Sequence, residues 1–274
     1  MKKNVFLFLS MVWLVLAAGT ARGEEFDHSN WGRVLKKFVA ETGRVDYATL
    51  KADSADLDRY VAQLAARSPA SHPQEFPTRN SQLAYWINAY NALVMKGVVE
   101  KWPVKSVVKI GLLPHSFFWR KKFVVGGKKY TLNNIEKDFL LKGLAEPRVH
   151  FALVCASNSC PPLRREAFTT ENTERLLEEG ARAFVNDSRH VRIEVGRNRI
   201  TLSKIFDWYK GDFEKYARAQ GSAGGEKALL DFLRIYADEP TRQALDTLDD
   251  PKIDHFDYDW GLNDVRRSLK AKSP

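Results

Sequence analysis

Two cysteines, Cys155 and Cys160, are the only thiols in the chain, and they stand five positions apart in the segment Cys-Ala-Ser-Asn-Ser-Cys-Pro. A cysteine thiolate activated by a histidine can attack an acyl carbon, as in cysteine hydrolases and acyltransferases. The same two residues could instead form a disulfide, which would contribute roughly 2 kcal/mol to stability because the loop is short. Both alternatives stay open. The spacing differs from Cys-x-x-Cys, so we do not expect a thioredoxin-like redox site.

His150 is the histidine nearest to this pair in sequence. It belongs to an apolar run with β-branched members, residues 149–154, which predicts a buried strand. Side chains alternate across a strand, so His150 and Cys155 would face opposite sides, about 16 Å apart. This geometry excludes a direct hydrogen bond between them and favours a core histidine. Cys160 would reach His150 only if its loop folded back along the strand.

Three polar residues complete the set of candidates for catalysis. Asn88 and Asn91 lie three apart on one predicted helix, where an amide could orient a histidine or tie the helix to neighbouring backbone. Glu136 could act as a general acid or base. If Asn133 caps a helix, however, Glu136 occupies the third helical position, where a capping-box carboxylate is common. No histidine pair has metal-ligand spacing, so we expect no metal and no cofactor.

The elements that must position these residues follow from periodicity. Apolar residues at intervals of three and four from Leu83 to Val98 predict a long central helix. Two hairpins are predicted, one at 123–130 turning at Gly126-Gly127 and one at 191–202, and each precedes a helix. Further expected elements are helices at 35–39, 57–64, 171–185, from Ser203 through 213, and at 227–237, and a strand at 256–260.

These elements predict an α+β fold. We expect the central helix to pack on a small mixed or antiparallel sheet, with two hairpin–helix units, in one domain over residues 24–274. Residues 1–23 read as a signal peptide cleaved after Gly23, because Lys2 and Lys3 precede a short apolar run and small residues precede the cleavage point. The expected location is therefore the periplasm or the outside of the cell, with membrane contact only during export.

The charge of the chain argues against a nucleic-acid partner. The net charge is +9, and removal of residues 1–23 takes away three positive charges and leaves +6. This is a mild surplus without a basic helix that interleaves aromatics, so we expect no nucleic-acid partner. The basic groups around the first hairpin, Arg120–Lys122 and Lys128-Lys129, could bind an anionic polymer or lipid or could guard an exposed edge strand.

Four segments together resemble the DUF547 family, bacterial exported proteins of unknown function. They are Trp-Ile-Asn-Ala-Tyr-Asn-Ala-Leu at 86–93, Leu-Asn-Asn-Ile-Glu at 132–136, His-Phe-Ala-Leu-Val-Cys-Ala-Ser-Asn-Ser-Cys-Pro at 150–161, and Tyr-Asp-Trp-Gly-Leu-Asn at 258–263. The resemblance extends from about residue 26 to 264. It implies a fold and a compartment rather than an activity.

Two functions are consistent with these observations. The first is a periplasmic recognition or scaffold domain that binds a peptide, a glycan or another envelope component at residues 157–162, with Cys155 and Cys160 joined. The second is a cysteine-dependent hydrolase or acyltransferase in which Cys160 or Cys155 attacks the substrate, a histidine deprotonates the thiol, and Asn88 orients that histidine. The sequence favours the first slightly, because it offers no thiol–histidine pair with a defensible geometry.

Overall fold

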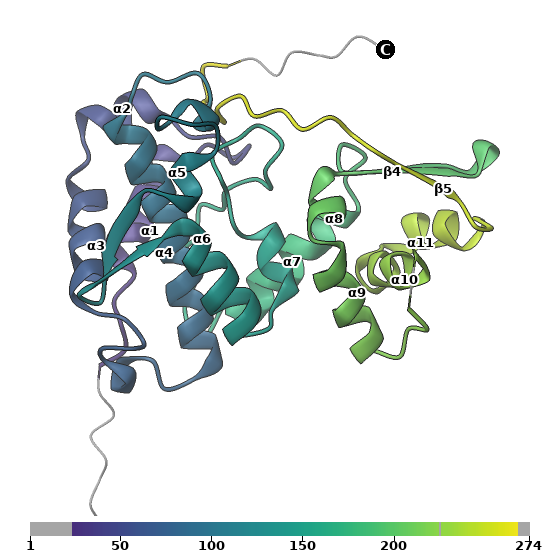
Figure 1. Ribbon diagram of the computed structural model, residues 1–274, viewed down its shortest axis with the longest axis horizontal. Coiled ribbons are helices and arrows are strands. Elements are labelled where there is room, and N and C mark those ends of the chain that lie inside the picture. Colours follow the sequence, from purple (N-terminus) through teal and green to yellow (C-terminus); the bar gives the residue numbers. More distant parts are fainter. Residues whose placement is uncertain (1–23, 225, 268–274) are drawn as a thin grey trace, which may run out of the picture.

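Two hydrophobic clusters organise the computed structural model, which describes residues 24–224 and 226–267. The first cluster is built from residues between Phe26 and Leu177 together with Leu262, and the second from Phe151 and residues between Ala181 and Leu245. Figure 1 shows the corresponding two lobes, joined by α7 (Thr173–Val185). The predicted signal peptide lies outside the described residues, and the prediction of one domain stays a prediction.

The first lobe surrounds α4 (Arg79–Glu100), the predicted central helix, which is buried along most of its length. Trp86 lies flat on Phe139, with ring centroids 4.1 Å apart. The lobe also contains α1 (Ser29–Phe38), α2 (Tyr47–Ala52), α3 (Ala55–Ala66), short 3-10 turns at Pro73–Glu75 and Val107–Lys109, α5 (Ser116–Trp119), β1 (Lys122–Val125), β2 (Lys128–Thr131), α6 (Leu132–Asn134), a π-helix at Ile135–Gly143 and a 3-10 helix at Pro147–Phe151.

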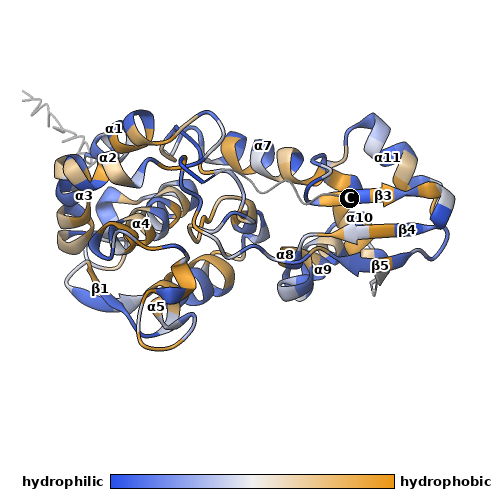
Figure 2. Ribbon diagram, turned by 90° about the horizontal axis from the view of Figure 1, so that it is seen from above, coloured by the Kyte–Doolittle hydropathy of each residue, from blue (hydrophilic) through white to orange (hydrophobic). Residues whose placement is uncertain are grey.

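The second lobe places a sheet over helices, as Figure 2 shows. β3 (Val191–Glu194) and β4 (Arg199–Leu202) are antiparallel and are joined by a 3-10 turn at Val195–Arg197; β5 (Lys252–His255) runs parallel to β4. The helices are α8 (Lys204–Trp208), α9 (Lys210–Ala219), α10 (Glu226–Tyr236) and α11 (Glu239–Asp246). After β5 the chain returns to the first lobe, where Leu262 pairs with Ser157 and Asp264 with Val45.

The α+β class and both hairpins are confirmed. Gly126 and Gly127 have φ of 55° and 77°, which suits the predicted two-residue turn, and Asn198 takes the left-handed conformation in the second turn. The two hairpins belong to separate sheets of two and three strands. Of the helices that the structure describes, none is long and apolar enough to cross a membrane.

Two predicted strands are wrong. The apolar run at 149–154 is not a strand, because Pro147 and the side chain of Glu146, which accepts the Arg148 N–H at 3.2 Å, begin a 3-10 helix there. The aromatic segment at 256–260 is irregular, and the strand before it ends at His255. The helix expected from Ser203 through 213 is interrupted at Tyr209 into α8 and α9, and α2 and α11 were not predicted.

Candidate functional site

The backbone that leads to the cysteines is fixed by Asn91 of α4. Its amide nitrogen donates to the Ala152 carbonyl at 2.9 Å, and its amide oxygen accepts the Val154 N–H at 2.8 Å. Both ends of one buried amide thus hold the residues immediately before Cys155. Of the two uses predicted for the helix asparagines, the tie to neighbouring backbone is the one that Asn91 makes.

A tight turn then brings the two cysteines together. Ala156 has a φ of 66°, a left-handed conformation that costs a residue with a Cβ about 1–2 kcal/mol. The Cys160 N–H donates to the Ser157 carbonyl at 3.3 Å, and the Cys155 N–H donates to the Cys160 sulfur at 3.0 Å. Such strain persists only where surrounding contacts impose it, and it concentrates at functional sites.

Both thiols are free, so the disulfide alternative is not what the structure contains. The two sulfur atoms are 2.7 Å apart, whereas bonded sulfurs lie at about 2.05 Å. The pair shares hydrogen bonds with two hydroxyls. Ser157 Oγ lies 3.2 Å from each sulfur, and Tyr258 Oη lies 3.4 Å from Cys160 Sγ and 3.5 Å from Cys155 Sγ.

The hydrogen bonds divide the two thiols into a donor and an acceptor. Burial alone would raise the pKa of Cys160, but hydrogen bonds from Cys155, Ser157 and Tyr258 outweigh it and lower that pKa to about 6. The pKa of Cys155 is raised, because its proton is held by Cys160 and because it is buried. These opposite pKa directions favour Cys160 as the first of the two sulfurs to ionise and Cys155 as the thiol that keeps its proton.

Cys155 and Cys160 line a cavity of about 210 Å³ between the two lobes. Both hairpin–helix units contribute to it. The first supplies Asn133, Glu136 and Lys137, and the second supplies Ile205, Trp208 and Tyr209. The other lining residues are Tyr90, Phe118, His150, Leu153, Tyr258 and Trp260. We refer to this space as the thiol cavity.

Glu136 lines this cavity, and it is not the capping residue that the sequence suggested. Thr131, not Asn133, caps α6, and its capping box is completed by Asn134. Glu136 follows in the π-helix, a form that occurs often at functional sites. Its buried Oε1 lacks a hydrogen-bond partner within the described chain and lies 3.3 Å from the Lys137 ammonium. Lys137 in turn lies over the Tyr209 ring at 4.1 Å, which joins the two units across the cavity.

His150 reaches the same cavity, contrary to the sequence prediction. A 3-10 helix does not impose the alternation of a strand, so the argument that separated His150 from the cysteines does not apply. The ring stacks on Tyr209 at 3.8 Å, and Nε2 lies 2.9 Å from Asp212 Oδ2. A carboxylate can only accept, so Nε2 carries the proton. Burial lowers the pKa of His150, partly offset by Asp212, and the ring is neutral at pH 7.

Asn88, by contrast, lies outside the thiol cavity. Its amide donates to the Phe168 carbonyl at 2.7 Å and accepts the Phe168 N–H at 3.1 Å. It also lies 3.1 Å from Nδ1 of His28 and does not line the thiol cavity. Asn88 therefore ties α4 to neighbouring backbone, which is one of the two roles predicted for it. It does not orient His150.

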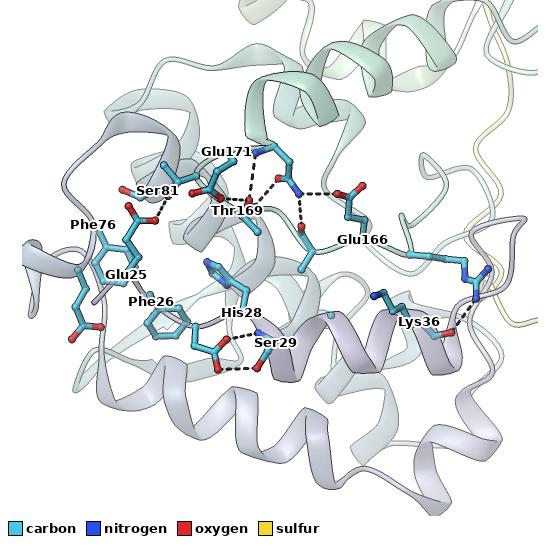
Figure 3. Close-up of a pocket in the computed structure, with 17 residues that line it drawn as sticks. Glu25, Phe26, His28, Ser29, Lys36, Phe76, Ser81, Glu166, Thr169 and Glu171 are labelled. Atoms are coloured by element: carbon cyan, nitrogen blue, oxygen red, sulfur yellow. Dashed lines mark hydrogen bonds between the residues drawn. The ribbon is translucent and has the colours of Figure 1, made fainter. Parts of the chain in front are cut away.

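Two further cavities border this region. One of about 510 Å³ lies on the other side of Cys160 and Tyr258 and is lined by polar groups that include Arg44, Asn158 and Lys204. Another of about 390 Å³, shown in Figure 3, surrounds His28 near the start of the described chain. Its polar side chains bond to one another, as Thr170 does to Glu25 at 2.8 Å, and it contains no thiol. Of these three cavities, the thiol cavity is the one that both cysteines line.

Sequence reasoning missed three residues of this site, Tyr258, Tyr209 and Asp212, and named Ser157 only as part of the predicted binding surface at 157–162. Ser157 lies inside the cysteine segment, and Tyr258 lies in the last of the four family-like segments. Their hydroxyls are 2.9 Å apart, although 101 positions separate them. Tyr209 and Asp212 come from the second hairpin–helix unit, and no spacing in the sequence links them to His150.

Comparison with known proteins identifies a family but no relative of known activity. Residues 73–185 match the model of the family described as "Protein of unknown function, DUF547". The match contains α4, the first hairpin–helix unit, His150 and both cysteines, and it ends with α7. No curated protein and no solved structure matches the chain.

Proposed function

Since residues 73–185 make this chain a member of the DUF547 family, we propose a function from the site itself: cysteine-dependent acyl transfer, with Cys160 as the nucleophile. One observation carries the proposal. The Cys160 sulfur accepts the Cys155 N–H and lies within hydrogen-bond distance of the Cys155 thiol and of the Ser157 and Tyr258 hydroxyls, inside a cavity that Glu136 and His150 also line. Donors gathered on one sulfur favour the thiolate, which is the nucleophilic form.

The chemistry follows from the charges. The Cys160 thiolate bonds to the acyl carbon of an ester or amide, and the negative charge moves to the acyl oxygen. The Tyr258 hydroxyl and the Cys155 N–H are donors next to that position. Burial raises the pKa of Tyr258, so this hydroxyl keeps its proton at neutral pH. When the leaving group departs with a proton, a thioester remains on Cys160, and water or an amine then takes the acyl group.

Two groups in the cavity can carry the required proton. Glu136 has a buried oxygen without a hydrogen bond, and His150 is held through Nε2 by Asp212. The aromatic rings of Trp208, Tyr258 and Trp260 form one side of the cavity, with Trp208 and Trp260 stacked at 5.7 Å. This wall fits an acyl group with an apolar or ring-containing body.

Acylation by p-nitrophenyl acetate tests the proposal without knowledge of the natural substrate. We expect a burst of about one equivalent of p-nitrophenol and one acetyl group on the peptide that contains Cys160. Cys160→Ser should abolish the burst, with a loss of roughly 10³-fold or more. Cys155→Ser is the matched control and should retain acetylation at Cys160. Acetylation at lysines alone, or equally in both variants, contradicts the proposal.

The pH dependence of iodoacetamide labelling tests the cause of reactivity. Native protein should be labelled at Cys160 with a midpoint near pH 6, and at Cys155 much more slowly. The Tyr258→Phe variant should move the midpoint upward, because the thiolate loses a donor. Labelling of both cysteines only after unfolding would mean buried, inert thiols and would exclude the proposed enzyme.

Recognition of a peptide or glycan is the second candidate, and one observation favours it. The cavity of about 510 Å³ is lined by Ser157, Asn158 and Pro161, which lie in the segment where the sequence predicted binding. This function needs no reactive thiol. Ligand binding that survives Cys160→Ser, together with the absence of acetylation, would select it over the enzyme.

A further inference from the structure

The positive charge of this protein is concentrated in one segment. Residues 101–131 contain eight lysine and arginine residues and no aspartate or glutamate, while the whole chain carries +9. All the other residues together therefore carry +1. The eight are Lys101, Lys105, Lys109, Arg120, Lys121, Lys122, Lys128 and Lys129.

Ion pairs do not neutralise this segment. Within the described ranges, Lys121 is the one member that forms an ion pair, with Glu100, and Arg120 instead lies over the Trp119 ring at 5.5 Å. All eight except Lys121 are exposed. Protection of a strand edge explains lysines on the β1–β2 hairpin, but Lys101, Lys105 and Lys109 lie outside any strand.

Large apolar side chains are exposed in the same segment. Leu112 is 97% exposed, and Leu113, Trp119 and Val124 are 49%, 50% and 42% exposed. These are four of the seven large hydrophobic side chains that are exposed in the described chain. Single exposed apolar residues are ordinary, but a cluster within a basic segment indicates a surface for a partner.

The loop holds its leucines outward in a defined conformation. Gly111 has a φ of 108°, and the Ser116 hydroxyl donates to the Leu113 carbonyl at 2.6 Å while accepting the Leu113 N–H at 3.3 Å. Phe117 anchors α5 in the core next to Gly97, and its ring contacts Phe123 of β1. Figure 2 shows β1 and α5 along the same side of the first lobe.

We propose that residues 109–122 bind the surface of an anionic lipid bilayer. Leu112, Leu113 and Trp119 would enter the interfacial layer, while Lys109, Arg120 and Lys122 meet the headgroups. A nucleic acid or acidic polymer would use the charges but not two aliphatic side chains at a loop tip. A second copy of this chain would bring eight like charges against eight. The inference does not rest on the proposed enzymatic function, and it departs from the sequence-based expectation that membrane contact occurs only during export.

The test is amide hydrogen exchange of the full chain with and without vesicles, resolved by peptide. Vesicles of phosphatidylglycerol and phosphatidylcholine are compared with vesicles of phosphatidylcholine alone. We expect exchange of peptides from 109–122 to slow about tenfold or more with the anionic vesicles only, and this slowing to weaken at high salt. Site resolution matters because the apolar run in residues 1–23 could itself associate with lipid.

Matched variants separate the contributions. Leu112→Ser with Leu113→Ser should remove most of the slowing, and so should Lys109→Gln with Arg120→Gln. The control, Val195→Ser with Arg197→Gln, makes the same chemical changes on the second hairpin and should leave the slowing intact. Circular dichroism checks that each variant is folded. Equal slowing with neutral vesicles, no slowing with either, or slowing that survives the leucine changes would each overturn the proposal.

Discussion

The two hairpin–helix units, residues 122–143 and 191–219, lie on opposite sides of the thiol cavity and begin in the same way. In each, an antiparallel hairpin runs into a hydroxyl residue that caps the next helix, Thr131 in the first and Ser203 in the second. After the cap they differ. The first continues as a π-helix that turns Glu136 into the cavity, and the second breaks at Tyr209 into two α-helices.

This difference shows what similar local sequences can and cannot determine. The residues where each hairpin ends, Lys-Lys-Tyr-Thr-Leu at 128–132 and Arg-Asn-Arg-Ile-Thr-Leu at 197–202, specify a strand and a helix start. The path of the helix afterwards is set by its partner. Phe139 of the first unit is stacked on Trp86 of the long central helix, whereas Trp208 of the second is half exposed beside Trp260.

The largest expected loss of stability comes from removing the ring that supports the first unit. Trp86→Ala removes a buried ring that stacks on Phe139 and should cost about 3–5 kcal/mol in the free energy of unfolding. Trp208→Ala, the counterpart in the second unit, should cost less than about 1 kcal/mol because that ring is exposed. Guanidinium unfolding of both variants measures the difference. Similar costs would show that the two units are equally anchored.

The turns offer the next comparison. Gly126→Ala should cost about 2 kcal/mol or more, because its Cβ would meet Ser68 Oγ at 2.0 Å at a φ that disfavours alanine. Gly127→Ala is the matched control, since nothing lies within 4 Å of its Cβ and only the backbone cost of about 1 kcal/mol applies. Equal losses in thermal or denaturant unfolding would mean that the turn does not dock on Ser68.

Acid should weaken the second unit through its buried histidine, His190. His190, next to β3, stacks on Phe184, and burial lowers its pKa to about 4. The unfolded chain, with a histidine pKa near 6.5, therefore binds a proton between pH 6.5 and 4 that the folded chain does not. Stability is thus lost as pH falls below 6.5, by up to about 2 kcal/mol at pH 5.

The first unit, residues 122–143, contains no histidine. Burial also lowers the pKa of His28 in the first lobe to about 4, so the measurement uses the His28→Phe variant. In that variant, amide hydrogen exchange at pH 5 and pH 7, corrected for the intrinsic rate, should show loss of protection in β3 and β4 and little change in β1 and β2. His190→Phe should remove the difference. A uniform change in both hairpins would mean that the lobes unfold as one unit.

The smallest effect concerns the contact between the units. Lys137 lies over the Tyr209 ring at 4.1 Å, and a double-mutant cycle of Lys137→Met and Tyr209→Leu should give a coupling energy of about 0.5–1 kcal/mol. The single variants alone are less informative, because Lys137 also pairs with Glu136 and Tyr209 also stacks on His150. A coupling of zero would show that the units meet without stabilising each other.

Local signals explain which elements could be predicted. Two glycines and Asn198 marked the turns, because a positive φ is required there and few residues accept it. The unpredicted helices also had signals: Asp46 caps α2 through the Thr49 N–H, and Asp238 caps α11 just before Pro240. At 149–154 the apolar run suggested a strand, although Glu146 and Pro147 marked the start of a helical turn.

The candidate site was predicted in part and for different reasons. The cysteine segment contained the sulfur pair and Ser157, so the sequence named both candidate thiols but did not choose between them. His150 was named but placed wrongly, since its position depended on the assumed strand. Tyr258 lies 98 residues from Cys160 in the sequence, and Asp212 lies 62 residues from His150. No local rule predicts such pairs. The site is assembled by the return of the C-terminal segment and by the packing of α9.

The return of the C-terminal segment determines when the site is completed during synthesis of the chain. Tyr258, which donates to the Cys160 sulfur, is synthesised 98 residues later, and at about 5–20 residues per second the delay is on the order of 5–20 s. During that interval Cys160 lacks one of the hydrogen bonds that lower its pKa. A nascent chain therefore carries a less reactive thiol than the finished one. The hydrogen-bonding groups around Cys160 are complete only when the last described segment has crossed from the second lobe to the first.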